Sequence, residues 1–179
     1  MKQLIKNRLF AAACLVVVII ASVFLGGFRS VKRLENKAYN AYFNDFVEYG
    51  DAGEDMKKMS RYASMLASVC NSCGCISPSF SDLADQFDKS VGEPYIDGKL
   101  YDSLFNEATV SYNLLINHPD AEVQQKISAK QYYYEIDAIM RRLENNEGYN
   151  ESAKKYNHAL QAFPVSLLLK KASRMIVFD

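Results

Sequence analysis

The segment GYNESAKKYNHALQAFP, residues 148–164, repeats an aromatic residue every seven positions. The repeat consists of three residue pairs: Tyr149-Asn150, Tyr156-Asn157 and Phe163-Pro164. Seven residues of an α-helix drift by only about 20° from two full turns, so the pairs are predicted to lie almost on one line of a helix. Ala153 and Leu160 fall between the aromatic residues at helical spacing. The pattern indicates a seam against which other helices pack, with the asparagines on its flank, where a buried amide can fix helix register.

The composition favours one helical domain. The chain has 179 residues, which is long enough for a single hydrophobic core. Its 21 Lys and Arg residues balance 21 Asp and Glu residues, so the formal net charge is +0 and no overall basic field favours nucleic acid as a partner. With Gly 8 and Pro 4, the chain has few residues for a fold of many turns. Long helices with few connections are the expected result.

Residues 9–28, LFAAACLVVVIIASVFLGGF, form an apolar stretch without a charged residue. Twelve of them are Leu, Val, Ile or Phe, which corresponds to about −4 to −7 kcal/mol for insertion into a membrane. Twenty helical residues span about 30 Å, the thickness of the hydrocarbon layer. A cleaved signal peptide is the alternative, but its apolar core is usually about 7–15 residues and ends at small residues. Gly26-Gly27-Phe28-Arg29 matches such a site poorly. We predict a retained transmembrane anchor at residues 9–28, after a short basic flank at residues 1–8.

The flanks of this stretch assign no orientation. The basic residues before it are Lys2, Lys6 and Arg8, and those after it are Arg29, Lys32 and Arg33. The positive-inside rule compares the two flanks, and here they are equal. The sequence therefore predicts a single-pass protein of the cell membrane and leaves open which side residues 30–179 occupy.

Helical periodicity continues through residues 30–179, the predicted bundle domain. Helices are expected at residues 30–49, 54–70, 80–89 and 99–116, followed by a long last helix at about 121–162. Gly148 is the weak point of this last helix, because an interior glycine costs about 1 kcal/mol relative to alanine. A C-cap there, with a new helix from Asn150, is the alternative. We favour continuity, with Pro164 as its end and a last amphipathic turn or two within residues 165–176. The predicted fold is all-α: an antiparallel up-and-down helical bundle with an N-terminal transmembrane helix.

An apolar N-terminus followed by Tyr39-Asn40, together with the paired motifs of residues 149–164, resembles the bacterial LemA family. Pro119-Asp120 before the last helix also fits the family's order. The chain departs from it in lacking an Asp-Leu-Ile-Pro-Asn-Leu-Val-like segment within residues 57–69, and Asn146 stands where the family usually has an arginine. The resemblance implies a divergent member with an antiparallel helical bundle on a single membrane segment. It implies no settled biochemical activity.

Three clustered cysteines are the most reactive feature of the sequence: Cys70, Cys73 and Cys75. Three thiolates in a Cys-x-x-Cys-x-Cys loop can bind zinc, with His118 as a possible fourth ligand. A zinc site usually has a second half-site at a recognisable spacing, and this sequence has none. In an oxidising compartment Cys70 and Cys73 can form a disulfide, whereas in the cytoplasm all three can remain thiols. We favour an inert or disulfide role and predict no metal and no cofactor.

No catalytic set is recognisable in the sequence. The only histidines are His118, before a proline, and His158, in the last helix. Neither has a sequence context that pairs it with a nucleophile, and no glycine-rich phosphate loop is present. Tyr132, Tyr133 and Tyr134 are expected to serve the core, with at least one ring near solvent. We predict a non-catalytic, membrane-anchored scaffold or protein-interaction module. The alternative is a metal- or redox-responsive module that uses the Cys70, Cys73 and Cys75 loop.

Overall fold

The computed structural model describes residues 2–43 and 51–178, with side chains from Phe10 onward. Within these residues the chain forms seven helices and no strand, so the all-α class is confirmed. The helices are α1 (Lys2–Phe43), α2 (Ala52–Ser72), α3 (Phe80–Ser90), α4 (Gly98–Asn117), α5 (Val123–Glu144), α6 (Glu147–Gln161) and α7 (Val165–Leu168). Residues 44–49 of the first predicted helix, and Gly50 of the turn after it, lie outside the described residues.

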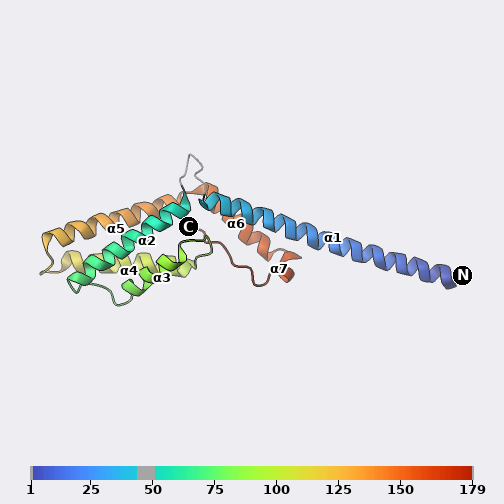
Figure 1. Cartoon of the computed structure of the whole chain (residues 1–179), viewed down its shortest axis with the longest axis horizontal. Helices are drawn as coiled ribbons and strands as arrows, with labels where there is room; N and C mark the ends of the chain where they lie inside the picture. Colours follow the sequence, from blue (N-terminus) through green and yellow to red (C-terminus); the bar gives the residue numbers. More distant parts are fainter. Residues whose placement is uncertain (1, 44–50, 179) are drawn as a thin grey trace.

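The molecule is elongated and has two packed parts (Figure 1). Helices α2 to α5 form an up-and-down bundle at one end. The second half of α1 packs beside α6 and α7, and the first half of α1 projects alone. From α7 the chain returns along α6 as a non-helical segment, residues 169–178, which we call the C-terminal segment. It ends near the junction between the two parts.

Helix α1 runs without a break from the apolar stretch into the packed domain. Among the described helices, it is the one that is long and apolar enough to cross a membrane, and the most apolar part of it has no buried residue. Membrane anchors and signal sequences share this property. The structure thus contains one candidate membrane-spanning helix near the N-terminus.

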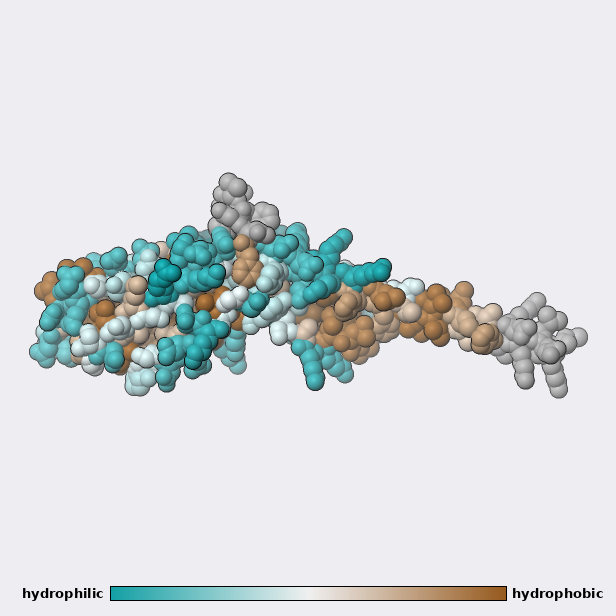
Figure 2. Space-filling model, in the orientation of Figure 1, coloured by the Kyte–Doolittle hydropathy of each residue, from teal (hydrophilic) through white to brown (hydrophobic). Residues whose placement is uncertain are grey.

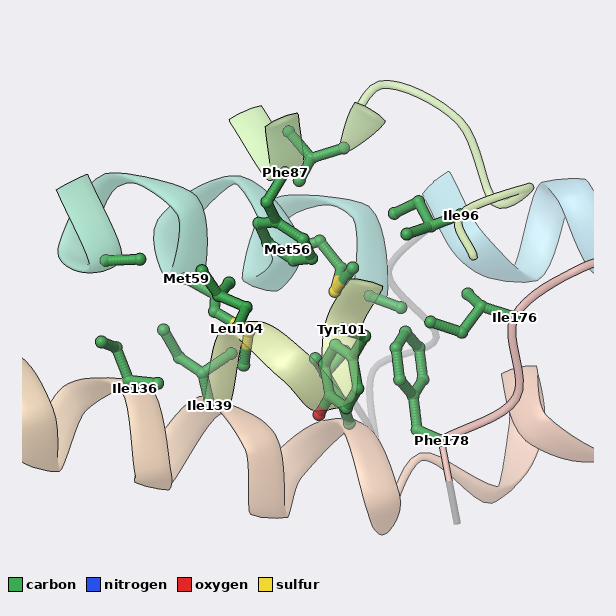
Figure 3. Close-up of a cluster of buried hydrophobic side chains, with 14 of the residues drawn as sticks. Met56, Met59, Phe87, Ile96, Tyr101, Leu104, Ile136, Ile139, Ile176 and Phe178 are labelled. Carbon is green, nitrogen blue, oxygen red and sulfur yellow. The ribbon is translucent and has the colours of Figure 1, made fainter. Parts of the chain in front are cut away.

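Apolar side chains at helical spacing form the core of the α2–α5 bundle (Figure 3). Met56 and Met59 of α2 lie next to Leu104 of α4, and Ile136 and Ile139 approach from α5. Each is at most 1% exposed. Burying a side chain of this size contributes about 1.5–3 kcal/mol. Met56 and Met59 therefore face the core, and this bundle is held mainly by apolar packing.

A chain of aromatic rings connects the two parts. Tyr42 of α1 contacts Tyr149 of α6 at 5.3 Å between ring centroids, Tyr149 contacts Phe178 at 5.6 Å, and Phe178 contacts Tyr101 of α4 at 5.3 Å. Such pairs contribute about 0.5–1.5 kcal/mol beyond the area they bury. Gly53 permits the approach of α2, since a Cβ there would lie 2.9 Å from the Tyr42 ring.

The prediction of one helix over residues 121–162 is wrong. Helix α5 ends at Glu144 and α6 begins at Glu147. The break lies at two asparagines rather than at Gly148, which is inside the first turn of α6. Asn146 accepts a hydrogen bond from the backbone N–H of Tyr149 at 3.0 Å and so caps α6. Asparagine side chains that bind nearby backbone compete with helix continuation, and the apolar periodicity alone does not reveal this.

The part of the chain after Pro164 contains one helical turn, in agreement with the predicted last turn or two. Helix α7 is a single turn, and the rest of the expected amphipathic stretch over residues 165–176 belongs to the C-terminal segment. Met175, Ile176 and Phe178 of this segment are buried. The backbone N–H of Ile176 also donates to the carbonyl of Pro94 at 2.8 Å, in the loop between α3 and α4. The segment thus fastens the α1–α6 part to the α2–α5 bundle.

Candidate functional site on helix α6

The first repeated pair, Tyr149-Asn150, binds backbone on two sides. The hydroxyl of the fully buried Tyr149 donates to the carbonyl of Ile176 at 2.7 Å. The Asn150 Nδ2 donates to the carbonyl of Leu143 at 2.8 Å, at the end of α5. Its Oδ1 accepts from the N–H of Phe178 at 3.0 Å. One amide therefore satisfies the end of α5 and holds the C-terminal segment.

The second pair, Tyr156-Asn157, repeats this arrangement two turns later. The Tyr156 hydroxyl donates to the carbonyl of Ser173 at 3.3 Å. The Asn157 Nδ2 donates to the carbonyl of Met175 at 2.8 Å, and its Oδ1 accepts from the N–H of the same residue at 2.9 Å. A side-chain amide that exchanges two hydrogen bonds with one residue imitates a neighbouring strand. We call these four side chains of α6 the Tyr–Asn ladder.

The spacing of the Tyr–Asn ladder matches an extended backbone. Asn157 binds Met175 and Asn150 binds Phe178, so seven residues of α6 correspond to three residues of the C-terminal segment, in the opposite direction. Seven helical residues rise about 10.5 Å, and three extended residues span about 10 Å. The seven-residue repeat therefore suits a helix that binds a non-helical chain. Both tyrosines lie on the buried side of α6, and the two asparagines bind backbone groups of the C-terminal segment and, for Asn150, of the end of α5.

Burial keeps both tyrosines in the form that donates a hydrogen bond. It raises the pKa of Tyr149 well above its usual range, and the neighbouring Tyr42 and Tyr95 raise it further. Burial is also the main cause of the raised pKa of Tyr156, to which Glu35 contributes. A phenol is protonated at neutral pH in any case, and the raised pKa values extend the pH range in which both hydroxyls donate to backbone carbonyls.

The other predicted seam residues are placed differently. Phe163 is 77% exposed because α6 ends at Gln161, before the helical line reaches it. Its neighbour Pro164 is buried. Tyr39 and Asn40 lie on the exposed side of α1, whereas Tyr42, which the motif does not include, is the buried aromatic residue. The seam therefore consists of Tyr149, Asn150, Tyr156 and Asn157, with Tyr42 packed across it.

The clustered cysteines bind backbone carbonyls. Cys70 donates to the carbonyl of Ser111 at 3.6 Å, Cys73 to that of Cys70 at 3.3 Å and Cys75 to that of Cys73 at 3.2 Å. All are free thiols. Burial raises the pKa of Cys70 to about 12 and that of Cys75 to about 11. Because the thiolate is the metal ligand and the nucleophile, these pKa shifts disfavour both roles.

The two histidines lie in different elements. His118 follows α4 in a turn, where its Nδ1 accepts from the N–H of Asp120 at 3.3 Å. His158 is exposed on α6. Across residues 2–43 and 51–178, no three His, Cys, Asp or Glu side chains are grouped so that they could hold a metal ion.

An ion pair between α2 and α5 was not predicted from the sequence. Arg142 donates through Nε and Nη2 to both carboxylate oxygens of Asp55, at 3.0 and 2.9 Å. The hydrogen bond to Asp55 is the main cause of the raised pKa of Arg142. Asp55 also lies in the first turn of α2, where a negative charge suits the helix dipole. A carboxylate four residues before the core residue Met59 is the signal that could have identified it as part of the buried face.

The outer face of α5 carries exposed apolar residues at helical spacing. Val123 is 76% exposed, Ile127 54% and Tyr134 52%, and we call these three residues the α5 stripe. Eleven residues separate the first from the last, which is about three full turns, so they share one line of the helix. Tyr132 and Tyr133 are partly buried against the core, so the expectation that at least one of the three consecutive rings lies near solvent is confirmed. Figure 2 shows apolar surface at this end of the bundle, far from the free half of α1.

Comparison of the chain with protein-family models, curated proteins and solved structures gave no match.

Proposed function

We propose that the chain is a non-catalytic, single-pass membrane protein whose helical bundle is a protein-interaction module. The observation that carries the proposal is the continuity of α1, which joins an apolar segment with no buried residue in its most apolar part to a packed domain. The exposed α5 stripe lies on the bundle at the other end of the molecule. This arrangement holds an apolar surface away from the membrane, where a partner protein can reach it.

Packing at the end of the apolar stretch supports a retained anchor over a cleaved signal sequence. A Cβ added at Gly27 would lie 3.2 Å from Val165 Cγ2, so α7 packs closely against this turn of α1. Val31, one turn later, is buried. Cleavage after residues 26–28 would cut the helix where the domain packs against it. The family resemblance to LemA proteins, which we keep as part of this proposal, also implies a single membrane segment.

Alkaline extraction of membranes tests the anchor. The full chain should remain in the membrane pellet, and mass spectrometry of the extracted protein should recover peptides that contain residues 9–28. Release into the supernatant, or a mature chain that begins near Arg29, would contradict the anchor. As a second check, removal of residues 1–25, which keeps the contact of α7 with Gly27, should yield a helical domain that no longer remains in the pellet.

Several buried polar side chains make structural bonds, and this supports a non-catalytic role. Asn150 and Tyr149 bind backbone, and Asp55 binds Arg142. The raised pKa values of Cys70 and Cys75 weigh against the metal- or redox-responsive alternative. Binding through a surface is then the activity that the exposed apolar residues suit best.

Site-specific photo-crosslinking in intact membranes tests the interaction surface. A photoreactive phenylalanine at Val123 or Ile127 should give a discrete adduct with the same partner, whereas one at exposed Lys57 of α2 should not. Tyr134→Glu should weaken the adduct formed at Val123, because it places a charge on the same apolar line. Equal labelling at all three positions, or no adduct from the α5 stripe, would contradict the proposal.

A further inference from the structure

The turn between α6 and α7 presents a second exposed apolar surface. Phe163 is 77% exposed, Leu167 56% and Leu168 52%, and we call these three residues the α7 tip. Pro164 and Val165, which separate them in the sequence, are buried. The tip is thus the outward side of a packed turn, and it exposes three large apolar side chains.

The α7 tip lies beside the last turn of the apolar stretch of α1. Val165 and Pro164 are the residues nearest to a Cβ added at Gly27, at 3.2 and 3.9 Å. Phe28, on the same turn of α1, is 47% exposed. In Figure 1, α7 lies at the point where α1 leaves the domain, and Figure 2 shows apolar surface continuing from the domain onto the free half of α1. If residues 9–28 cross a bilayer, the tip is held at the membrane surface.

Basic residues surround the α7 tip on the side of the domain. Lys170 and Lys171 follow it and are exposed, and Arg29 and Arg33 are exposed on the adjacent turns of α1. Apolar side chains flanked by Lys and Arg are typical of segments that lie in the interface of a membrane, where the apolar groups enter the acyl boundary and the cations contact anionic headgroups. Long basic side chains can also extend from the apolar layer to the headgroups.

We propose that the α7 tip inserts into the interfacial layer of the bilayer that α1 spans, with Lys170 and Lys171 bound to anionic headgroups. The inference rests on the proposed membrane anchor. A bilayer suits the tip better than a protein partner does, because the apolar surface is continuous with that of the span. The consequence is attachment at two points. One helix alone leaves a domain free to tilt, whereas the added contact of α7 fixes the direction in which the bundle and its α5 stripe extend from the membrane.

Lipid quenching of a fluorescent amino acid tests the inference in the full chain. The label is placed singly at Val17 in the span, at Leu168 in the tip or at Ile127 in the α5 stripe, all of them exposed apolar positions. The protein is reconstituted in vesicles that contain phosphatidylglycerol and lipids brominated close to the headgroup or at mid-chain. We expect mid-chain quenching at residue 17. At residue 168 we expect headgroup-proximal quenching at least about three times that at residue 127.

The labels at residues 17, 127 and 168 distinguish failure of the tip inference from failure of the membrane anchor. Quenching at residue 17 without quenching at residue 168 would overturn the tip inference and leave the anchor intact, whereas no quenching at residue 17 would overturn both. Equal quenching at residues 127 and 168 would also overturn the inference, because it would show that the label or the whole domain binds lipid. Two variants serve as controls for a label at Phe163. Leu167→Glu with Leu168→Glu should abolish its quenching, and Lys170→Gln with Lys171→Gln should reduce it in anionic vesicles but not in zwitterionic ones.

Discussion

Each of the two parts of the molecule is stabilised by a different kind of interaction. In the α2–α5 bundle, apolar side chains from all four helices fill the core. In the α1–α6 part, two helices leave one side open, and the C-terminal segment covers it through the Tyr–Asn ladder. Apolar burial is not directional and tolerates exchange of similar side chains, whereas hydrogen bonds to backbone require one residue type at one position. The seven-residue motif therefore stands out in α6, where backbone is bound, and no such motif occurs in α2.

The largest effects should come from removing a buried aromatic residue in either part. Tyr149→Ala and Phe87→Ala should each lower the free energy of unfolding by about 3–5 kcal/mol, because each empties a fully buried site. Phe163→Ala, at the exposed third aromatic residue of the motif, should change it by less than about 0.5 kcal/mol. Denaturant unfolding in detergent measures all three. If Phe163→Ala lowered the free energy of unfolding as much as Tyr149→Ala does, all three aromatic residues of the motif would belong to the buried seam, as the sequence suggests.

The two asparagines of the Tyr–Asn ladder should contribute different amounts to the free energy of unfolding. Asn150→Ala should cost about 2–3 kcal/mol, because it leaves the buried Phe178 N–H without a partner and removes one of the two hydrogen bonds to the Leu143 carbonyl. Asn157 is half-buried, so water can replace part of its bonds and Asn157→Ala should cost only about 1–2 kcal/mol. The same unfolding measurement checks the order. If Asn157→Ala lowered the free energy of unfolding more than Asn150→Ala does, the greater structural role assigned to the buried Asn150 would be contradicted.

Breaking the ion pair between Arg142 and Asp55 should lower the free energy of unfolding of the protein by a moderate amount. Arg142→Ala should cost about 1–3 kcal/mol, chiefly because it leaves the buried Asp55 carboxylate without its partner. Asp55→Ala should cost less, since the Arg142 side chain is 48% exposed and can be hydrated. A double-mutant cycle measures the coupling between the two residues. Additive effects would show that the pair does not join α2 to α5.

The smallest changes in stability are expected from removing a single tyrosine hydroxyl, at Tyr101 or at Tyr149. In the part of the chain that the structure describes, the hydroxyl of Tyr101 is the one buried side-chain polar atom without a hydrogen-bond partner. Tyr101→Phe should therefore leave stability unchanged or raise it by up to about 1 kcal/mol. Tyr149→Phe removes the bond to the Ile176 carbonyl and should cost about 1–2 kcal/mol. Equal losses in thermal unfolding would mean that the Tyr149 hydroxyl bond contributes nothing specific.

The sequence predicts the helices well where apolar spacing decides them. The apolar spacing that includes Met56 and Met59 places α2, and the spacing that includes Ile136 and Ile139 predicts a helix over α5 but not where it ends. The break at Asn145-Asn146 was missed because the cap is a local hydrogen bond that leaves the apolar phase unchanged. The hydroxyl of Tyr156 binds a non-helical segment, which the predicted packing of helices on the seam did not include. Periodicity reports which face of a helix is buried, but it does not report what covers that face.

The amide exchange rates of the C-terminal segment test the central claim most directly. The Met175 N–H is bound by Asn157, the Phe178 N–H by Asn150 and the Ile176 N–H by the Pro94 carbonyl. Hydrogen exchange resolved by NMR should show all three protected in the full chain. Asn157→Ala should accelerate exchange of the Met175 amide by at least about tenfold, with a smaller change at Phe178, and Asn150→Ala should do the reverse. Unchanged protection of both amides in both variants would contradict the ladder.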